Sequence, residues 1–557
     1  MRKLFIFVAS ILSVLQLPAQ TAPGKYWIQF TDKNPSAFSI DRPGEFLSVR
    51  ALERRERYDI PVTEQDLPVA RPYMDSLVSA GAVLLNRSKW FNAVTIQVTD
   101  TTVLGRIRQF PFVRQLKSVR TIKSGLLIED KFGMENECLQ LNHSVTDTTE
   151  LRYGQAARQI GMLNGHVLHN QGFQGQGMVI AVLDGGFTNV NTNHVFDTLR
   201  NNNQILGTWD FVNNCPLAFN EHNHGAQVLS VMGGNLPGQL VGTAPKASFF
   251  LLRTEDAASE YLVEEDNWVA GAEWADSAGA DLINSSLGYT HFDDPSTNHS
   301  YEDMDGNSTR ISQAADIAAA KGMLVVTSAG NEGSSAWHFI SAPADADSIL
   351  TVGAVDSLGN YVLFSSTGPT RDGRIKPDVT AQGSLTAIAG SDGNIYRGSG
   401  TSFSSPVVCG LVACLWQTNR SLPPMTIIET LRESASMSEN PDSLYGYGLP
   451  DFGKALFLLQ GINPVRLEDE SLLRIYPNPF SEAFTVEFYS HDRQDIAIDL
   501  LTVNGRKLLS GKCQSGYTSI NRMEIGRYSS LPDGIYILRI TTGSGGQYVQ
   551  RIVKASR

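Results

Sequence analysis

Gly398-Ser399-Gly400-Thr401-Ser402-Phe403-Ser404-Ser405-Pro406 leads directly into an apolar run, Val407–Trp416. Apolar residues occupy every side of that run, which is typical of a buried helix. Thr401 and Ser402 could simply cap the helix, or a serine there could act as a nucleophile beside free N–H groups that bind an oxyanion. Pro406 is expected in the first turn, where no N–H donor is required. The stretch alone leaves both explanations open.

A buried parallel sheet is predicted for the middle of the chain. Apolar runs and strand-like segments alternate there with helical patterns over 260–278 and 308–320. Strands with no polar face are covered on both sides, so we expect an α/β fold with a doubly wound, mostly parallel sheet and helices on both faces. Such folds bind ligands beyond the C-terminal ends of the strands. The expected strands are 178–183, 248–252, 281–287, 323–326 and 349–355.

Three polar residues stand at the ends of these elements. Asp184 and Asn331 each follow a predicted strand, and His224 begins a short helical segment. Asp and Asn also have an ordinary explanation, because both are common turn residues. His222 and His224 could bind a metal, but no Cys, Glu or further His follows at a usable ligand spacing. We therefore prefer His224 as a catalytic residue.

The order of the polar residues along the chain separates the hydrolase folds. Asp184, His224 and Ser402 run Asp, His, Ser, whereas lipase-type enzymes run Ser, Asp, His and chymotrypsin-type enzymes run His, Asp, Ser. Ser402 also lacks the Gly-x-Ser-x-Gly elbow of the lipases. On an α/β scaffold, this order is that of subtilisin.

The region from about Tyr153 to Leu459 resembles the subtilisin-like serine peptidases, or subtilases. It departs mildly from the usual family pattern at Gly185, Ala226 and Phe403-Ser404, and no departure removes a group that the chemistry needs. The matching motifs are Val179–Gly186, His224-Gly225-Ala226, Ser328–Asn331 and Gly400–Pro406.

The resemblance implies a secreted serine endopeptidase that works through an acyl-enzyme. Ser402 would attack the peptide carbonyl, His224 would transfer the proton, and Asp184 would orient the imidazole. Asn331 and the Ser402 backbone N–H would bind the oxyanion. Protein or peptide substrates would pair, as an added strand, with the segment Ser286, Leu287 and Gly288.

Two segments precede the catalytic region, which we place at 150–460. Residues 1–20 combine a basic start with an apolar run and small residues, as in a secretory signal peptide. Residues 24–125 have the size and α+β pattern of the propeptides that chaperone and inhibit subtilases, so the chain's own propeptide is an expected inhibitor. The connection from Ser124 to Glu150 has no periodicity and is expected to be exposed.

Residues 467–557 show short alternating strands with turn signals, which predicts a separate all-β sandwich. Leu472–Pro479 and Asp533–Arg539 resemble the C-terminal sorting domain of the type IX secretion system. That resemblance implies a protein secreted from a Gram-negative bacterium or held on its surface, with the type IX machinery as a partner.

The charge is unevenly distributed along the chain. Residues 21–130 carry a net charge of +4, residues 131–465 carry −20, and residues 466–557 carry +2. The acidic middle argues against nucleic acid as a partner. A basic segment beside an acidic one suggests that the two dock. Five cysteines are too few for a disulfide framework in an exported chain. Cys409 and Cys414 are expected to be small buried hydrophobic residues, and Cys138 and Cys215 could pair.

No cofactor is required by this chemistry. One acidic loop offers weak calcium candidates in Asp303, Asp305 and Asn307, although its spacing is not that of an EF-hand. Two other functions stay open: a binding protein on an inactive subtilase scaffold, which is disfavoured because every catalytic position holds a usable residue, and a peptide ligase that uses the same site.

Overall fold

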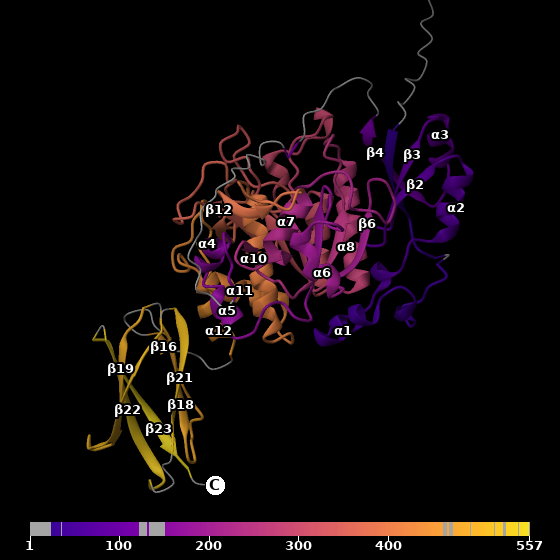
Figure 1. Ribbon diagram of the computed structural model, residues 1–557. Helices are drawn as coiled ribbons and strands as arrows, with labels where there is room; N and C mark the ends of the chain where they lie inside the picture. Colours follow the sequence, from indigo (N-terminus) through magenta and orange to yellow (C-terminus); the bar gives the residue numbers. More distant parts are fainter. Residues whose placement is uncertain are drawn as a thin grey trace, which may run out of the picture.

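The computed structural model describes residues 24–34, 36–121, 131–132, 151–460, 465–466, 472–490, 492–516, 518–526, 531–543 and 545–555. The predicted signal peptide, and most of the connection before residue 151, lie outside the described residues. Figure 1 shows the N-terminal unit in indigo beside the central α/β region, and the C-terminal strands in yellow. Within the described part, no helix is long and apolar enough to span a membrane.

The central region is built on one seven-stranded sheet in the order β13-β12-β11-β10-β5-β9-β6, with every neighbouring pair parallel. This confirms the predicted fold class. Two of its strands were not predicted, because β6 is a half-exposed edge strand and β13, with the sequence Val-Thr-Ala-Gln, is not a continuous apolar run. The strands are β5 (Val179–Asp184), β6 (Ile205–Asp210), β9 (Ser248–Arg253), β10 (Leu282–Ser285), β11 (Leu324–Ser328), β12 (Leu350–Val355) and β13 (Val379–Gln382).

Helices cover both faces of this sheet. Successive side chains of a strand point to opposite faces, so Ile180 and Val182 enter one core while Ala181 and Leu183 enter the other. The first core includes α7 (His224–Gly233) and α10 (Thr401–Gln417), and the second includes α8 (Val263–Ala278) and α9 (Arg310–Ala320). Smaller elements complete the region: α4 (Ala157–Gly161), α5 (His166–Asn170), α6 (Asp197–Asn201), α11 (Pro424–Ser434), α12 (Phe452–Leu459), β7 (Asn235–Leu236), β8 (Leu240–Val241), β14 (Thr386–Ala389) and β15 (Ile395–Gly398).

The strand order places a switch point at the middle of the sheet. After β5 the chain fills the sheet on one side with β6 and β9, and then on the other side from β10 to β13. β5 and β10 are therefore neighbours whose following loops part in opposite directions. Ligands bind at such a point, beyond the carboxyl ends of the strands, and Asp184 is the last residue of β5.

The N-terminal unit is an antiparallel sheet in the order β2-β3-β1-β4. One face, with Ile28 and Ile96, packs on two helices of the unit, while Trp27 on the other face packs against Val263 of α8. The unit thus covers one side of the central region (Figure 1). Its elements are β1 (Gly24–Phe30), α1 (Val49–Arg57), α2 (Arg71–Ser79), β2 (Val83–Ser88), β3 (Ala93–Val98), α3 (Thr102–Ile107) and β4 (Val113–Thr121).

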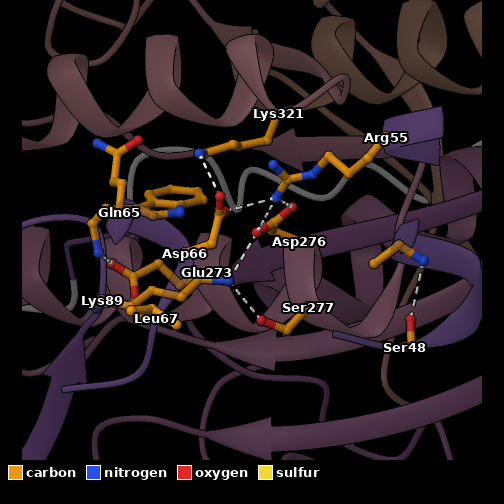
Figure 2. A network of polar contacts seen from close by, with 12 residues as sticks. Ser48, Arg55, Gln65, Asp66, Leu67, Lys89, Glu273, Asp276, Ser277 and Lys321 are labelled. Carbon is orange, nitrogen blue, oxygen red and sulfur yellow. Dashed lines mark hydrogen bonds and ion pairs between the residues drawn. The ribbon is translucent and has the colours of Figure 1, made fainter. Parts of the chain in front are cut away.

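Buried ion pairs join the N-terminal unit to α8 (Figure 2). The carboxylate of Asp276 accepts hydrogen bonds from Arg54 at 2.5 Å and from Arg55 and Lys89 at 2.8 Å each. Lys321 of the central region pairs in turn with Asp66 of the N-terminal unit at 3.1 Å. The predicted docking of the basic segment on the acidic one is therefore seen in specific contacts.

The C-terminal region consists of two four-stranded antiparallel sheets, β16-β17-β18-β21 and β20-β19-β22-β23, that share one apolar core. The Asn504-Gly505 pair makes the predicted turn between β19 and β20, with Gly505 at φ 80°. Tyr489 of this region donates its hydroxyl to Asp451, which caps α12, at 2.7 Å. The strands are β16 (Val465–Arg466), β17 (Leu472–Tyr476), β18 (Phe484–Ser490), β19 (Asp495–Thr502), β20 (Lys507–Gln514), β21 (Ser519–Ile525), β22 (Gly534–Thr542) and β23 (Gln547–Lys554).

Candidate active site

Asp184 and His224 form a buried pair at the switch point of the sheet. The Nδ1 atom of His224 lies 2.7 Å from Oδ1 of Asp184, and both side chains have no exposed surface. The backbone N–H of Gly185 donates to the same oxygen at 2.7 Å. A carboxylate can only accept from Nδ1, so the pair fixes the tautomer of the neutral ring and makes Nε2 its basic nitrogen.

A glycine allows this pair to come together. His224 is the first residue of α7, and Gly225 follows it. A Cβ atom on Gly225 would lie 2.5 Å from the carbonyl oxygen of Gly186 and 2.9 Å from Cβ of Asp184. Any side chain at this position would push α7 away from the end of β5. His222, in the loop before the helix, accepts a hydrogen bond from the backbone N–H of His224 at 3.1 Å.

Ser402 is the second residue of α10 and is 97% removed from solvent, with 3% of its surface exposed. Its Oγ lies 3.3 Å from the carbonyl oxygen of Ser286, just past β10. Gly400 is the N-cap residue, and Thr401 and Ser402 are the first two residues of the helix itself. The explanation of Thr401 and Ser402 as mere helix caps is therefore wrong.

The expectation for Pro406 is also wrong, because it is the sixth residue of α10 and lies inside the helix rather than in its first turn. A proline there leaves the carbonyl four residues earlier, that of Ser402, without its usual N–H partner. The hydroxyl of Ser286 donates to that carbonyl at 2.9 Å. The loop after β10 thus completes the hydrogen bonding of the helix that carries the serine.

Asn331 lies three residues after β11, against the start of α10. Its Oδ1 atom accepts from the backbone N–H of Thr401 at 2.8 Å and from the Thr401 hydroxyl at 2.9 Å. A backbone N–H can only donate, so the amide oxygen must face Thr401 and the amide NH₂ group faces away from it. Asn331 also lines the cavity that contains Ser402.

A cavity of about 490 Å³ joins the predicted site residues. Ser402 and Asn331 line it, and so do Ser286, Leu287 and Gly288, the segment predicted to pair with substrate. His224 does not line the cavity, but its ring centroid lies 5.9 Å from that of Phe403, the residue after Ser402. The cavity therefore brings Ser402 and Asn331 together with the predicted substrate edge.

Phe132 covers the imidazole of His224, which the sequence did not predict. The two rings are stacked with their centroids 4.3 Å apart and 17° between their planes, and the ring of His222 lies 4.9 Å from Phe132. Phe132 is 6% exposed, so the prediction that the whole connection from Ser124 to Glu150 is exposed is wrong at this residue. Gly185 makes room for it, since a Cβ there would lie 2.8 Å from the Phe132 ring.

Three glutamates, which the sequence analysis also missed, surround the ammonium group of Lys131. Lys131 Nζ lies 3.1 Å from Glu260 and 2.6 Å from Glu264, and it also pairs with Glu255. Burial raises the pKa of Glu260 to about 7 and raises that of Glu264 as well. The acidic residues at the start of the helix predicted at 260–278, and just before it, were the available signal.

The carboxylates of the predicted calcium candidates accept hydrogen bonds from residues of their own loop. Asp303 accepts from the backbone N–H and the hydroxyl of Ser300 at 2.7 and 2.8 Å. Asp305 accepts from the backbone N–H groups of Asn307 and Ser308 at 2.8 and 2.7 Å. Within the described residues, the carboxylates close enough to share one cation are those of Glu255, Glu260 and Glu264, and not these.

The cysteines follow expectation where the structure describes them. Cys409 and Cys414 are buried in α10, and burial raises the pKa of both thiols. Cys138, considered as a partner for Cys215, lies outside the described residues.

Three parts of the chain match known protein families. Residues 175–448 match the Subtilase family, residues 25–131 match the Peptidase S8 propeptide domain of Bacteroidota, and residues 474–555 match a secretion system C-terminal sorting domain. Subtilisin BL from Lederbergia lenta is 30% identical over 283 residues, which are 50% of this chain and 91% of that protein. Subtilisin DY from Bacillus licheniformis is 29% identical over 294 residues, or 52% of this chain and 94% of that protein.

These matches confirm the predicted propeptide and type IX sorting domain, and with them a protein that is secreted from a Gram-negative bacterium or displayed on its surface. The match to Subtilisin BL extends over nearly that whole protein, and the Subtilase family match includes both residues of the buried Asp–His pair. The chain therefore belongs to the subtilase family of serine peptidases.

Proposed function

We propose that this protein is a secreted endopeptidase that hydrolyses peptide bonds in proteins through Asp184, His224 and Ser402. The observation that carries the proposal is the 2.7 Å contact between Asp184 and His224, fully buried at the switch point beside the start of α10. Such a pair holds a histidine ready to act as a base on a neighbouring hydroxyl.

Each residue has one part in the reaction. Ser402 Oγ attacks the peptide carbonyl, and Nε2 of His224 takes the hydroxyl proton. His224 then gives this proton to the leaving amine, so the C–N bond breaks and an ester with Ser402 remains. Water repeats the sequence, releasing the acid and restoring the serine. Asp184 stabilises the imidazolium that forms in each half of the cycle.

The oxyanion that forms on the carbonyl needs donors. We assign this role to the amide NH₂ of Asn331 and to the backbone N–H of Ser402, which belongs to the first turn of α10, where the N–H groups point out of the end of the helix. Substrate would lie extended along Ser286, Leu287 and Gly288, which border the same cavity.

The other parts of the chain control where and when this activity appears. We propose residues 1–20 as the signal peptide, 24–125 as an inhibitory and folding propeptide, 150–460 as the peptidase domain, and 467–557 as the domain recognised by the type IX machinery. The buried ion pairs of Asp276 support the propeptide assignment, because they hold the unit on α8.

The chemistry requires no cofactor, since this chain supplies the nucleophile, the base and the oxyanion donors. Calcium at Asp303, Asp305 and Asn307 stays a prediction. A drop in melting temperature when a chelator removes calcium would support it, provided that the chelator has no such effect on Asp305→Asn.

A serine-directed phosphonate tests the proposed function directly. Matured protein should be labelled at Ser402 and should cleave casein, and Ser402→Ala should lose about a million-fold in turnover with the fold intact. A binding protein on an inactive scaffold would show neither labelling nor cleavage. A ligase would be labelled but would join peptides faster than it hydrolyses them.

A further inference from the structure

We propose that Glu255, Glu260 and Glu264 form a substrate subsite for a lysine or arginine side chain, next to a site over His224 that takes an aromatic side chain. Lys131 and Phe132 of the chain's own connection fill both before maturation. The inference rests on the proposed function and specifies the substrates of the same cleft.

A primary ammonium group is already seen in the glutamate cluster. Besides its three carboxylate contacts, Lys131 Nζ donates to the carbonyl oxygen of Ser259 at 3.1 Å. An ammonium has three donors, and the cluster surrounds it with four oxygen-bearing groups. The cluster is thus a site with its ligand in place, and the ligand is a basic side chain.

The glutamates are held in position by the protein and not only by Lys131. Glu255 and Glu264 are each 1% exposed. The hydroxyl of Tyr289 donates to Glu255, and that of Ser259 donates to Glu264 at 3.3 Å. Buried carboxylates with fixed partners keep their arrangement when the cation leaves, as a recognition site must.

Two other nearby cations are committed elsewhere. Arg120 pairs with Asp256 at 3.4 Å, and Arg253 pairs with Asp210 at 2.8 Å. Glu255 and Glu260 line the cavity that contains Ser402, and among the described residues Lys131 is the cation that forms ion pairs with the three carboxylates. Buried charges of one sign are costly unless they are paired, so the cluster favours substrates that bring a positive charge.

Contacts of the backbone and of the ring hold Lys131 and Phe132 in place. The backbone N–H of Lys131 donates to the carbonyl oxygen of Ala257 at 3.4 Å, which ties it to the loop after β9. The next residue places its ring on His224, where Gly185 leaves space for it. Both residues line the cavity that contains Ser402. A substrate with a basic residue followed by an aromatic one would fill the same two positions.

Peptide hydrolysis tests the preference. Full-length protein is allowed to mature and is given quenched peptides with the sequence of residues 128–137, carrying Lys, Arg or Gln at the position of Lys131. We expect kcat/KM to be about 30-fold or more higher for Lys and Arg than for Gln, the usual loss when one partner of a buried charge pair is removed. Glu264→Gln should reduce that ratio at least tenfold. Glu433→Gln, which removes an exposed charge on α11, should leave the ratio unchanged.

A ratio near one in a protein that cleaves these peptides would overturn the subsite and leave the peptidase standing. A metal site would also overturn the subsite. In that case added Ca²⁺ would raise the activity, Glu264→Gln would abolish this response, and the enzyme would show no preference for peptides with a basic residue.

A second measurement does not depend on catalysis. In full-length Ser402→Ala protein, added chymotrypsin is used to cut after Phe132, and the cut is followed by mass spectrometry. Lys131→Met should speed this cut about tenfold or more, whereas Lys131→Arg should keep the protection. Equal rates in all three proteins would refute the occupancy of the subsite, even if the protein proved to have no peptidase activity.

Discussion

The hydroxyl of Ser286 donates a 2.9 Å hydrogen bond to the carbonyl of Ser402, and Ser402 Oγ lies 3.3 Å from the carbonyl of Ser286. The two residues come from different elements, the loop after β10 and the start of α10. Because Pro406 has no N–H, the helix itself offers this carbonyl no partner at its usual position. Ser286 therefore fixes the backbone of the proposed nucleophile.

Ser286→Ala should lower kcat by about tenfold, with a smaller change in KM, and should destabilise the protein by about 1–2 kcal/mol, because a buried carbonyl loses its partner. Steady-state kinetics and urea unfolding measure the two effects. Ser286→Thr should restore both. Ser434→Ala is the matched control, since Ser434 is a buried serine on α11 whose hydroxyl donates to the Leu431 carbonyl at 2.9 Å. It should cost similar stability without affecting kcat, and an equal kcat loss in both variants would contradict a specific role for Ser286.

Asn331→Ala should lower kcat by about 100- to 1000-fold with KM nearly unchanged, the usual cost of losing one oxyanion donor. Asn331→Asp separates this role from simple positioning of Thr401. An aspartate keeps an oxygen that can accept from Thr401, but it has no donor for the oxyanion. Both variants should therefore be impaired at neutral pH. If Asn331→Asp kept wild-type kcat, the amide would serve only to hold the start of α10.

Gly185→Ser introduces the side chain that subtilases commonly have at this position. In the unprocessed chain its Cβ would meet the Phe132 ring at 2.8 Å. Overpacking of this kind costs about 1–3 kcal/mol, so the ring should leave His224 more often. We expect the phosphonate to label Ser402 of the full-length protein about tenfold faster. Gly161→Ser, with nothing within 4 Å of its added atom, is the control and should show no change.

The catalytic residues could be predicted from the sequence, but the residues that cover them, such as Phe132, could not. Asp184 and Asn331 follow continuous apolar runs, and such runs are read as buried strands whatever the rest of the fold does. Phe132 lies in a segment without periodicity, and its burial depends wholly on partners far along the chain. The glutamates of the subsite were visible as an acidic run, but only the fold shows that two of them are buried.

The wrong prediction for the position of Pro406 in α10 has a different cause. Local rules exclude proline from a helix interior, so the sequence predicts a helix that starts late. The structure begins α10 five residues earlier than Pro406 because Ser286, which is 120 residues away in sequence, satisfies the carbonyl. No local rule contains that compensation.

Docking of the N-terminal unit should weaken as the pH rises toward 8, through Glu273. This carboxylate accepts from the Ser88 hydroxyl and the Lys89 N–H at 2.6 Å each, and burial raises its pKa to about 7 (Figure 2). Undocked, its pKa returns toward 4.5. The docked state then binds more protons, so its advantage is full below about pH 4.5 and is lost as the pH rises through 7, by about 3 kcal/mol in all.

Proteolysis across a urea series at pH 5 and pH 8, on full-length Ser402→Ala protein, measures this weakening. Glu273→Gln should be nearly insensitive to pH over that range. Glu53→Gln, an exposed residue of α1, should respond like the parent. A parent protein whose N-terminal unit is released at the same urea concentration at both pH values would refute the role of Glu273.

Through Asp276, docking of the N-terminal unit should also weaken at acid pH. Burial opposes its ionisation, but Lys89, Arg54 and Arg55 more than offset that cost, and the pKa of Asp276 falls to about 2. Since the undocked value is near 3.8, its contribution of about 2 kcal/mol is present above pH 4 and is lost as the pH falls through 2.

Asp276→Asn leaves the three cations buried without their shared carboxylate, so it should cost about 3–5 kcal/mol of docking at pH 5 and remove the loss between pH 4 and pH 2. Asp256→Asn breaks the Arg120 pair at the same interface, where both side chains are 26% exposed, and should cost less than about 1 kcal/mol. The same urea series compares the two. Equal costs in the two variants would show that the burial of an ion pair does not decide how firmly it holds the N-terminal unit.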